Sequence, residues 1–582
     1  MKILERELNK EQLEIAKAAA EGRSLVVIAG PGTGKTHLLT HVAAHRVRTS
    51  HPAPWKVLCL TFSVEATKQL RTRLREPALG IRAPSRLEIA NFHQFGSRLL
   101  GAYGHHLKGP DGTPWPRQAQ VLDEAEARDL AVEVIAAANI QGVNPSQAAE
   151  AIHRYRYEGA QTLRPPRGTF EDILRAYEER LWRERVRDFD DLVLHATRLL
   201  EEQPRIAGIL AETFRFIVVD ELQDSSMQQM QLVWLIAGKG TTPVFAVGDN
   251  DQMIYAWRDA KPRNLTWWEN RFGSERHFLL GNYRCAREIV SAADALIQHN
   301  PHPENWERPY SLRKNPGAVY SAEAMDVADE AQLVGEIVEA EIARGVQPGE
   351  IAVLASKHAA IKAVEDVLRL SGIPRVRVGD DAAEQRPVAK GLRAALTLVV
   401  APDSPRARRR LADVCDAAPD LDEIIELLRD ARTCEGFLER LEPKLRRVVQ
   451  HTEDVEHARK ILALAQRESP GEPPTAIGRN IALEWHRLNV QLQRETESVK
   501  LMTTLAAKGL GFRVVIVTAF RNGEMPHVYA RGQQLLEERR KAYVAMTRAE
   551  EHLHLVWSDP GSPYLDEIGA ANLTPYDRNG LH

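Results

Sequence analysis

The sequence predicts an α/β protein with parallel sheets, organised as two α/β regions that are each interrupted by a mostly helical insertion. Apolar runs of strand length alternate with helical patterns, and this alternation is typical of parallel sheets. Two longer stretches, 105–187 and 402–495, show mainly helical patterns. A chain of 582 residues is long enough to form several hydrophobic cores.

The first α/β region alternates from near its start. The apolar run Ser24–Ala29 ends in a glycine-rich turn, and a helical pattern follows over 37–48. A second run, Val57–Phe62, is again followed by a helical pattern, and further runs occur at Phe216–Val219 and Val244–Val247. Such runs are typical of strands buried on both faces of a sheet.

The second α/β region begins near Phe278 and contains strand-like runs at Ile351–Leu354, Val514–Val517 and Leu553–Val556. Each helical stretch therefore interrupts an α/β region. We expect six segments: 1–104 and 188–277 around the insertion 105–187, then 278–401 and 496–582 around the insertion 402–495.

Composition narrows the class of protein. With 77 basic and 80 acidic residues the net charge is -3, which excludes a polycation but leaves local basic grooves open. Four cysteines without a CxxC pair disfavour a disulfide framework and a cysteine zinc site. The apolar runs are too short to cross a bilayer, and the first residues lack a secretory core. We expect a cytoplasmic protein without a membrane partner.

The turn after the first strand reads AGPGTGKT over Ala29–Thr36 and opens a helical pattern. This is the context of a P-loop, in which backbone N–H groups close around phosphate oxygens at a helix N-terminus. We expect Lys35 to reach the β- and γ-phosphates and the Thr36 hydroxyl to bind Mg²⁺. An ordinary glycine-rich turn is the alternative. It is disfavoured because a strand, the GKT sequence and a helix occur here together. The nucleotide-binding residues expected here are Gly30, Pro31, Gly32, Thr33, Gly34, Lys35 and Thr36.

A later apolar strand, Phe216–Val219, ends in two carboxylates, Asp220 and Glu221. Asp220 can hold Mg²⁺ through water, and Glu221 can orient and deprotonate an attacking water. Such a pair alone is usually a solvated strand end. Its position after a P-loop and a buried strand favours the catalytic interpretation.

Two segments carry a family resemblance. Asp220–Asp224 (DELQD) and Gly248–Arg258 (GDNDQMIYAWR) together resemble the UvrD/Rep/PcrA group of superfamily 1 helicases. Many motifs in the family order leave little room for coincidence. The likeness extends to Leu8–Gln12, Thr61–Ser63, Asn91–Phe95, Asp188–Leu192, Asn282–Arg284, Thr503–Phe512, Glu537–Arg548 and Ser562–Ile568.

The resemblance implies two RecA-like P-loop motor domains with ATP and Mg²⁺ bound between them. It implies that Gln12 reads the adenine and that Tyr283 stacks on it. Gln252 would sense the γ-phosphate. Arg284 and Arg548 would act as arginine fingers, which can be worth roughly 10³–10⁵ in rate. A surface salt bridge is the alternative for each arginine taken alone.

The resemblance also implies a single-strand binding groove. Aromatic side chains in such grooves stack on bases at about 1–3 kcal/mol each without reading sequence. Core packing is the alternative for the aromatic residues, above all Phe62 and Phe189. For the basic and aromatic segment 153–157 we favour a solvated helix face over a DNA contact. The expected DNA-binding residues are Thr61, Phe62, His93, Phe189, Tyr255, Trp257, Arg258 and Tyr564.

Three positions depart from the family pattern: His37 replaces a common arginine, Leu505 a common histidine and Gly511 a common glutamate. The usual glutamate accepts a ribose hydroxyl bond, so nucleotide discrimination is expected to be looser. The second insertion is short for the family, which points to a motor that unwinds poorly alone.

The resemblance implies an ATP-dependent 3′→5′ DNA helicase or translocase that acts on single strands and duplex junctions. The alternative is a DNA-dependent ATPase subunit of a nuclease-coupled repair or anti-phage defence complex, with weak unwinding alone and a nuclease, repair or defence protein as its partner. A nucleotide-switched clamp that does not hydrolyse ATP is a third interpretation. The hydrolytic set disfavours it, since a switch does not need Glu221, Gln252, Arg284 and Arg548 together.

Overall fold

The computed structural model describes residues 2–49, 55–81, 83–110, 112–115, 120–122, 124–138, 144–158, 168–254, 263–302, 306–379, 387–400, 405–414, 426, 436, 439–440, 452–468, 488 and 490–578. The chain divides into two compact units. Unit 1 contains Met1–Glu330 and Ala507–His582, and unit 2 contains Ala331–Ala506. The six-segment division expected from the sequence stays a prediction.

Unit 1 contains a six-stranded sheet with the strand order β3-β2-β6-β7-β1-β8, and all of its strand pairs are parallel. The predicted runs near its start became strands, so the expected α/β class with parallel sheets is confirmed. The strands are β1 (Leu25–Ala29), β2 (Lys56–Thr61), β3 (Leu87–Asn91), β6 (Phe214–Val219), β7 (Val244–Gly248) and β8 (Glu275–Leu279).

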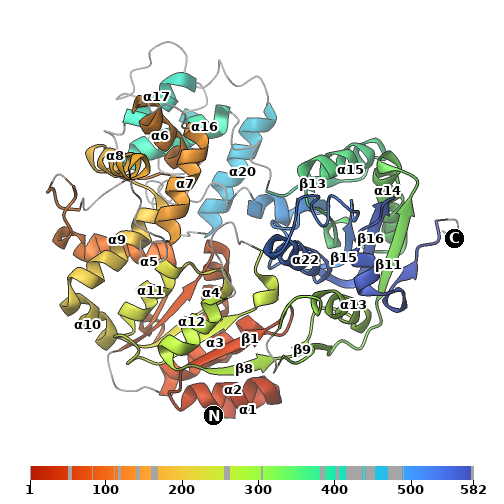
Figure 1. Cartoon of the computed structure of the whole chain (residues 1–582), viewed down its shortest axis with the longest axis horizontal. Helices are drawn as coiled ribbons and strands as arrows, with labels where there is room; N and C mark the ends of the chain where they lie inside the picture. The colour runs from red at the N-terminus through yellow and green to blue at the C-terminus, as the bar shows by residue number, and fades with distance from the viewer. Residues whose placement is uncertain are drawn as a thin grey trace. The chain divides into compact units, whose positions relative to one another are not determined.

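Both faces of this sheet are buried. Val26 and Leu60 belong to a core shared with one set of helices, whereas Val27 and Cys59 belong to a core shared with the other set. Successive side chains of a strand point to opposite faces, so strands with two buried faces must be apolar throughout. The first set is α5 (Phe92–Tyr103), α9 (Phe189–Glu202), α10 (Pro204–Thr213), α11 (Met227–Ile236) and α12 (Arg263–Phe272); the second is α1 (Lys2–Glu7), α2 (Lys10–Ala20), α3 (Lys35–Thr49) and α4 (Val64–Leu74) (Figure 1).

The stretch 105–187 has a small core of its own. Leu130, Ile152 and Tyr177 are buried within it. They come from three helices, α6 (Glu124–Ala137), α7 (Pro145–Glu158) and α8 (Thr169–Arg183), in line with the mostly helical pattern of the sequence. A short parallel pair joins β4 (Gln120–Val121), which lies within the stretch, to β5 (Val186–Arg187) at its end.

The remaining part of unit 1 contains four parallel strands in the order β15-β16-β11-β17. A second parallel pair, β9 (Gly281–Asn282) with β10 (Tyr310–Ser311), lies near the start of this part. The elements are β11 (Ala318–Ala324), β15 (Phe512–Val517), β16 (Ala549–Ser558), β17 (Thr574–Pro575), α13 (Arg287–Ile297), α22 (Gln533–Met546) and α23 (Tyr564–Ile568).

Unit 2 contains parallel strands in the order β13-β14-β12, with α15 packed on β12 and β14. None of the helices described in either unit is long and apolar enough to cross a membrane. Its elements are β12 (Ile351–Ala355), β13 (Arg375–Arg377), β14 (Val499–Thr503), α15 (His358–Leu370), α16 (Pro387–Val400), α17 (Pro405–Val414) and α20 (Thr452–Glu468), and α14 (Val327–Ala343) leads into it.

The six-stranded sheet brings the predicted motifs to one edge. Thr61 pairs with Asn91, Leu60 with Val219, and Ile28 with Gly248 in register. Because these strands are parallel, the segments that follow their carboxyl ends share one edge of the sheet. That edge is where open α/β sheets bind their ligands.

Candidate nucleotide site and nucleic-acid interface

The P-loop lies between β1 and α3, as predicted. Gly32 and Gly34 have φ angles of +71° and +83°, where a side chain is strained. A Cβ on Gly32 would lie 2.5 Å from the Cβ of Arg284, and a Cβ on Gly34 would lie 2.7 Å from Gln12 Nε2. The expected finger Arg284 and the expected adenine reader Gln12 therefore pack directly against the loop.

Helix α2 carries Gln12, the expected adenine reader, and its N-cap Asn9 bonds to Tyr283, the expected stacking residue. Asn9 and Gln12 form a capping box at its start. The buried Gln12 side chain donates from Nε2 to the Thr33 carbonyl at 3.3 Å. Asn9 Nδ2 donates to the Tyr283 hydroxyl at 2.6 Å, and the tyrosine is 46% exposed. An aromatic ring fixed by its hydroxyl yet open to solvent fits a stacking role.

Asn282 joins the second family motif to the P-loop. Its Nδ2 donates to the Pro31 carbonyl at 2.8 Å. Its Oδ1 accepts the N–H groups of Arg284 at 2.8 Å and Cys285 at 2.9 Å. The buried side chain thereby fixes the backbone of Arg284 beside the loop, a role that no residue was given from the sequence.

The two carboxylates at the end of β6 differ in charge. Burial, together with Glu221, raises the pKa of Asp220 to about 7. Burial opposes ionisation of Glu221 as well, but Lys35 and Lys508 outweigh it and lower the pKa of Glu221 to about 2. Glu221 also adopts φ +52°, which is uncommon for a residue other than glycine and is found at functional sites. The ionised group is the one expected to accept a proton.

A chain of hydrogen bonds connects Glu221 to Gln252. Gln223 Nε2 donates to Glu221 Oε2 at 2.5 Å, and Gln223 Oε1 accepts the Asp249 N–H at 3.0 Å. Gln252 Nε2 then donates to Asp249 Oδ2 at 2.6 Å. Burial and the neighbouring Asp251 raise the pKa of Asp249 to about 6. Gln223 and Asp249 were missed from the sequence, although both lie inside motifs that it displays.

Arg548 is buried close to Arg284. Its guanidinium donates to the carbonyls of Val544 at 2.9 Å and Leu510 at 3.1 Å, and to Thr547 Oγ1 at 3.0 Å. Burial, with the positive charge of Arg284, lowers the pKa of Arg548 to about 9. A guanidinium held by neutral oxygens near a second one is favourable for a polyanion such as a triphosphate.

Thr61 does not present its side chain to solvent. It is fully buried, and its hydroxyl lies 2.6 Å from that of Thr67 and 3.0 Å from the Ser63 carbonyl. Thr61 therefore stabilises the turn after β2. Phe62 follows it and is half-buried, so its ring is the more accessible of the two.

His93 and Phe189 lie together, as a shared groove requires. Their ring centroids are 5.4 Å apart in an edge-to-face arrangement. Asn91 and Asp188 cap the helices that begin with these segments, α5 and α9. A Cβ on Gly96 would lie 2.4 Å from the Leu192 carbonyl oxygen, so the two helices approach closely because residue 96 has no side chain.

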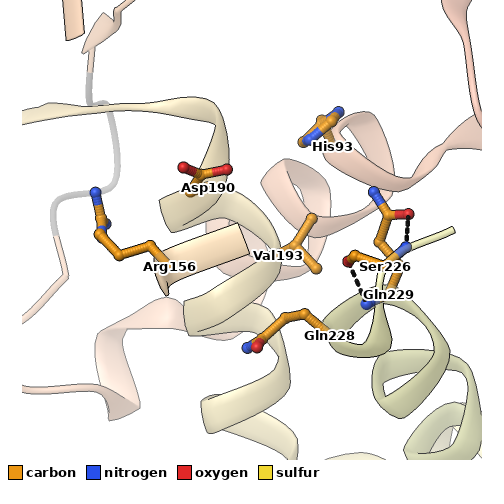
Figure 2. A pocket seen from close by; sticks show the side chains of 7 residues that line it. All are labelled: His93, Arg156, Asp190, Val193, Ser226, Gln228 and Gln229. Atoms are coloured by element: carbon orange, nitrogen blue, oxygen red, sulfur yellow. Dashed lines mark hydrogen bonds between the residues drawn. The ribbon is translucent and has the colours of Figure 1, made fainter. Parts of the chain in front are cut away.

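A pocket opens beside this pair (Figure 2). Polar side chains from α5, α7, α9 and the start of α11 face it, and Ser226 and Gln229 are held by the capping box of α11. It is lined by His93, Arg156, Asp190, Val193, Ser226, Gln228 and Gln229.

The structure does not place Tyr564 where a base could reach it. The side chain is fully buried, with Arg539 over its ring at 5.5 Å and its hydroxyl 3.5 Å from the Leu535 carbonyl. Its expected stacking role is therefore replaced by packing between α22 and α23. Tyr255, Trp257 and Arg258 lie outside the described residues, so their DNA contacts stay predictions.

The expectation of a solvated face on α7 is wrong for Arg156. This residue is 2% exposed and forms ion pairs with Asp188 and Asp191 at the start of α9. On the same helix His153 Nδ1 lies 2.6 Å from Asp190 Oδ2, whereas Arg154 is exposed. Arg156 thus anchors the helical insertion to the helix that carries Phe189.

Family comparisons agree with this geometry. The model of the UvrD/REP helicase N-terminal domain matches residues 8–273, and that of the UvrD-like helicase C-terminal domain matches residues 421–559. The chain belongs to the UvrD/Rep helicase family. Domains of the UvrD/Rep family are RecA-like, so the RecA-like class predicted for this chain is confirmed.

Curated relatives within the UvrD/Rep family cover most of the chain. It is 26% identical over 629 aligned residues to the ATP-dependent DNA helicase PcrA of Staphylococcus epidermidis, covering 95% of this chain and 84% of the relative. It is 28% identical over 634 residues to DNA helicase II of Escherichia coli, covering 96% and 86%. These alignments are longer than the 582 residues of the chain, so both relatives carry residues that it lacks.

Proposed function

We propose that this protein is an ATP-dependent DNA helicase that moves 3′→5′ along single-stranded DNA. The observation that carries the proposal is the convergence of Lys35, Glu221 and Arg284 at one P-loop, with Arg548 close to Arg284. The names of the relatives support ATP-dependent action on DNA. The direction of movement rests on the family resemblance alone.

The residues around the loop divide the work of hydrolysis. Thr36 and Asp220 offer the oxygen ligands that Mg²⁺ prefers, and bound Mg²⁺ supplies charge neutralisation at the phosphates. Glu221 is held ionised by Lys35 and accepts the proton of the attacking water. Arg284 and Arg548 stabilise the charge that develops during phosphoryl transfer.

Hydrolysis is coupled to movement through contacts between the P-loop and the segment Asn282–Arg284. Asn282 and Tyr283 bond to the carbonyls of Pro31 and Gly32. A change in nucleotide state that shifts the P-loop therefore shifts the segment that carries Arg284. Phe62, His93 and Phe189, at the carboxyl edge of the same sheet, would hold the single strand.

The short second insertion favours a second candidate, a DNA-dependent ATPase that unwinds poorly without a nuclease or a repair or defence protein. The lengths of the alignments with both helicases support this candidate, since the relatives contain additional residues.

One set of assays tests both candidates. ATP hydrolysis is measured with and without single-stranded DNA, and unwinding is measured on duplexes with a 3′ or a 5′ tail. The helicase proposal expects DNA-stimulated turnover and unwinding of the 3′-tailed substrate alone. Stimulated turnover without unwinding favours the second candidate. Turnover that DNA does not change contradicts both.

A further inference from the structure

A lysine in the segment before β15 reaches two loops of the hydrolysis site. Lys508 Nζ lies 2.8 and 2.6 Å from the two carboxylate oxygens of Asp224 and 2.8 Å from the Gln252 carbonyl oxygen. The side chains of Lys508 and Asp224 are 9% and 2% exposed. An ammonium group has three protons, and these three acceptors are placed to use them. Buried, charge-assisted contacts of this kind are stronger than surface ion pairs.

Each partner of Lys508 belongs to a loop with an expected catalytic group. Asp224 ends the short turn Leu222–Asp224, which directly follows Glu221. Gln252 ends the turn Asn250–Gln252 and points its side chain at Asp249. Lys508 thus fixes the backbones that aim the expected base and the expected γ-phosphate sensor.

The same segment also holds an expected finger. Two residues after Lys508, the Leu510 carbonyl accepts the Arg548 guanidinium at 3.1 Å. The segment 508–510 therefore connects the loops that follow Glu221 and contain Gln252 to Arg548, through the contacts of Lys508 with Asp224 and the Gln252 carbonyl and that of Leu510 with Arg548.

We propose that Lys508 is a positioning residue for ATP hydrolysis, which holds the Glu221 and Gln252 loops in register with Arg548. The proposal rests on the proposed function and deepens it by naming what aligns the two sides of the site. Lys508 does not contact the substrate in this role. Misplacement of catalytic groups by about 1 Å can cost on the order of 10²-fold in rate, so a residue of this kind affects turnover more than binding.

The electrostatics of Asp224 agree with this arrangement. Burial raises the pKa of Asp224 to about 6, while Lys508 and Lys35 oppose the increase and Glu221 adds to it. Without Lys508, the buried carboxylate of Asp224 would remain near Glu221 with less positive charge to balance it.

The test compares Lys508→Met, Lys508→Arg, Asp224→Asn and the double variant Lys508→Met/Asp224→Asn with the parent. DNA-stimulated kcat and the KM for ATP are measured for each. We expect Lys508→Met to lower kcat by roughly 10–100-fold with KM changed by about twofold or less, because Lys35, Gln12 and Tyr283 still bind nucleotide. Lys508→Arg keeps the charge and should recover part of the loss. The double variant should cost less than the two single losses multiplied, since both remove one interaction.

A matched control is Lys56→Met, which removes another lysine of unit 1. The Lys56 side chain is 40% exposed and lies 3.9 Å from Glu88. It should leave kcat, KM and the melting temperature near the parental values.

The outcomes separate this inference from the proposed function. A parent without DNA-stimulated hydrolysis contradicts the proposed function and the inference with it. An active parent with parental kcat in Lys508→Met overturns the inference alone. So do multiplicative losses in the double variant, or a loss of kcat that follows the melting temperature in every variant, which indicates a purely structural role.

Discussion

Lys35 Nζ lies 3.5 Å from Glu221 Oε1, so the cation of the P-loop and the expected base neutralise each other directly. The lysine is therefore used twice. It is expected to face the phosphates of a bound nucleotide, and its charge lowers the pKa of the half-buried Glu221.

Lys35→Ala should abolish ATP turnover while the protein stays folded. The substitution removes the charge at the phosphates and also the cation that holds Glu221 ionised. Steady-state ATPase assays and a thermal melt of the same sample check both statements, with Lys56→Ala as the control. A folded variant that hydrolyses ATP at the parental rate would show that the P-loop assignment is wrong.

Glu221→Gln should bind ATP but lower hydrolysis by roughly 10²–10⁴-fold, because the amide keeps the size of the side chain and loses the base. Nucleotide binding is measured by titration and turnover by phosphate release. Glu212→Gln is the control, since the Glu212 side chain is 71% exposed on α10. Normal multiple turnover by Glu221→Gln would remove this residue from the mechanism.

Trp257→Ala should weaken single-strand binding by about 1–3 kcal/mol, the amount expected for one base–aromatic stack. ATP binding should barely change, while stimulation of hydrolysis by DNA should fall. Trp257→Phe keeps an aromatic face and serves as the control. DNA titration and melting of one sample separate stacking from core packing: a large drop in melting temperature supports a core residue, and no change in either measurement rules out both roles.

Arg156→Ala should lower the free energy of unfolding by about 3–5 kcal/mol, because Asp188 and Asp191 would stay buried without their cation. Arg154→Ala, on the same helix but exposed, should change it by about 0.5 kcal/mol or less. Denaturant unfolding measures both. Equal effects of the two substitutions would contradict the buried anchor.

His302 should make stability depend on pH. Burial lowers the pKa of this imidazole, but its hydrogen bond to Asp251 and the charge of Asp249 outweigh burial and raise the pKa above 6.5. A raised pKa in the folded state means that the stabilisation is complete below pH 6.5 and is lost as the pH rises through the folded value.

Thermal melts between about pH 5.5 and 8.5 check this expectation. His302→Asn should remove the part of the pH dependence that the parent shows across neutral pH, while His299→Asn, which changes an exposed histidine nearby, should leave it unchanged. A parental pH profile in His302→Asn would contradict the role of the Asp251 pair.

Local patterns were enough to predict the strands and the P-loop. The run before Gly30 and the one before Asp220 are apolar because both faces of the sheet are covered, and that signal is contained in a few consecutive residues. The expected positions of Lys35 and Gln252 follow from the same short segments.

Contacts between distant residues could not be predicted in this way. Lys508 and Asp224 are separated by 284 positions, and Arg156 and Asp188 by 32. The burial of Tyr564 could not be predicted either. An aromatic residue in a family motif has the same local sequence signal whether its ring is exposed or packed under Arg539.

The close approach of Gly96 to Leu192 has a consequence for the stretch between them. Gly96 before the stretch 105–187 packs closely against the backbone of Leu192 after it. Within the stretch, β4 pairs with β5. The chain therefore enters and leaves the insertion at neighbouring positions. Its surface segments can therefore change in length and sequence while His93 and Phe189 keep their spacing, provided that Arg156 keeps its ion pairs with Asp188 and Asp191.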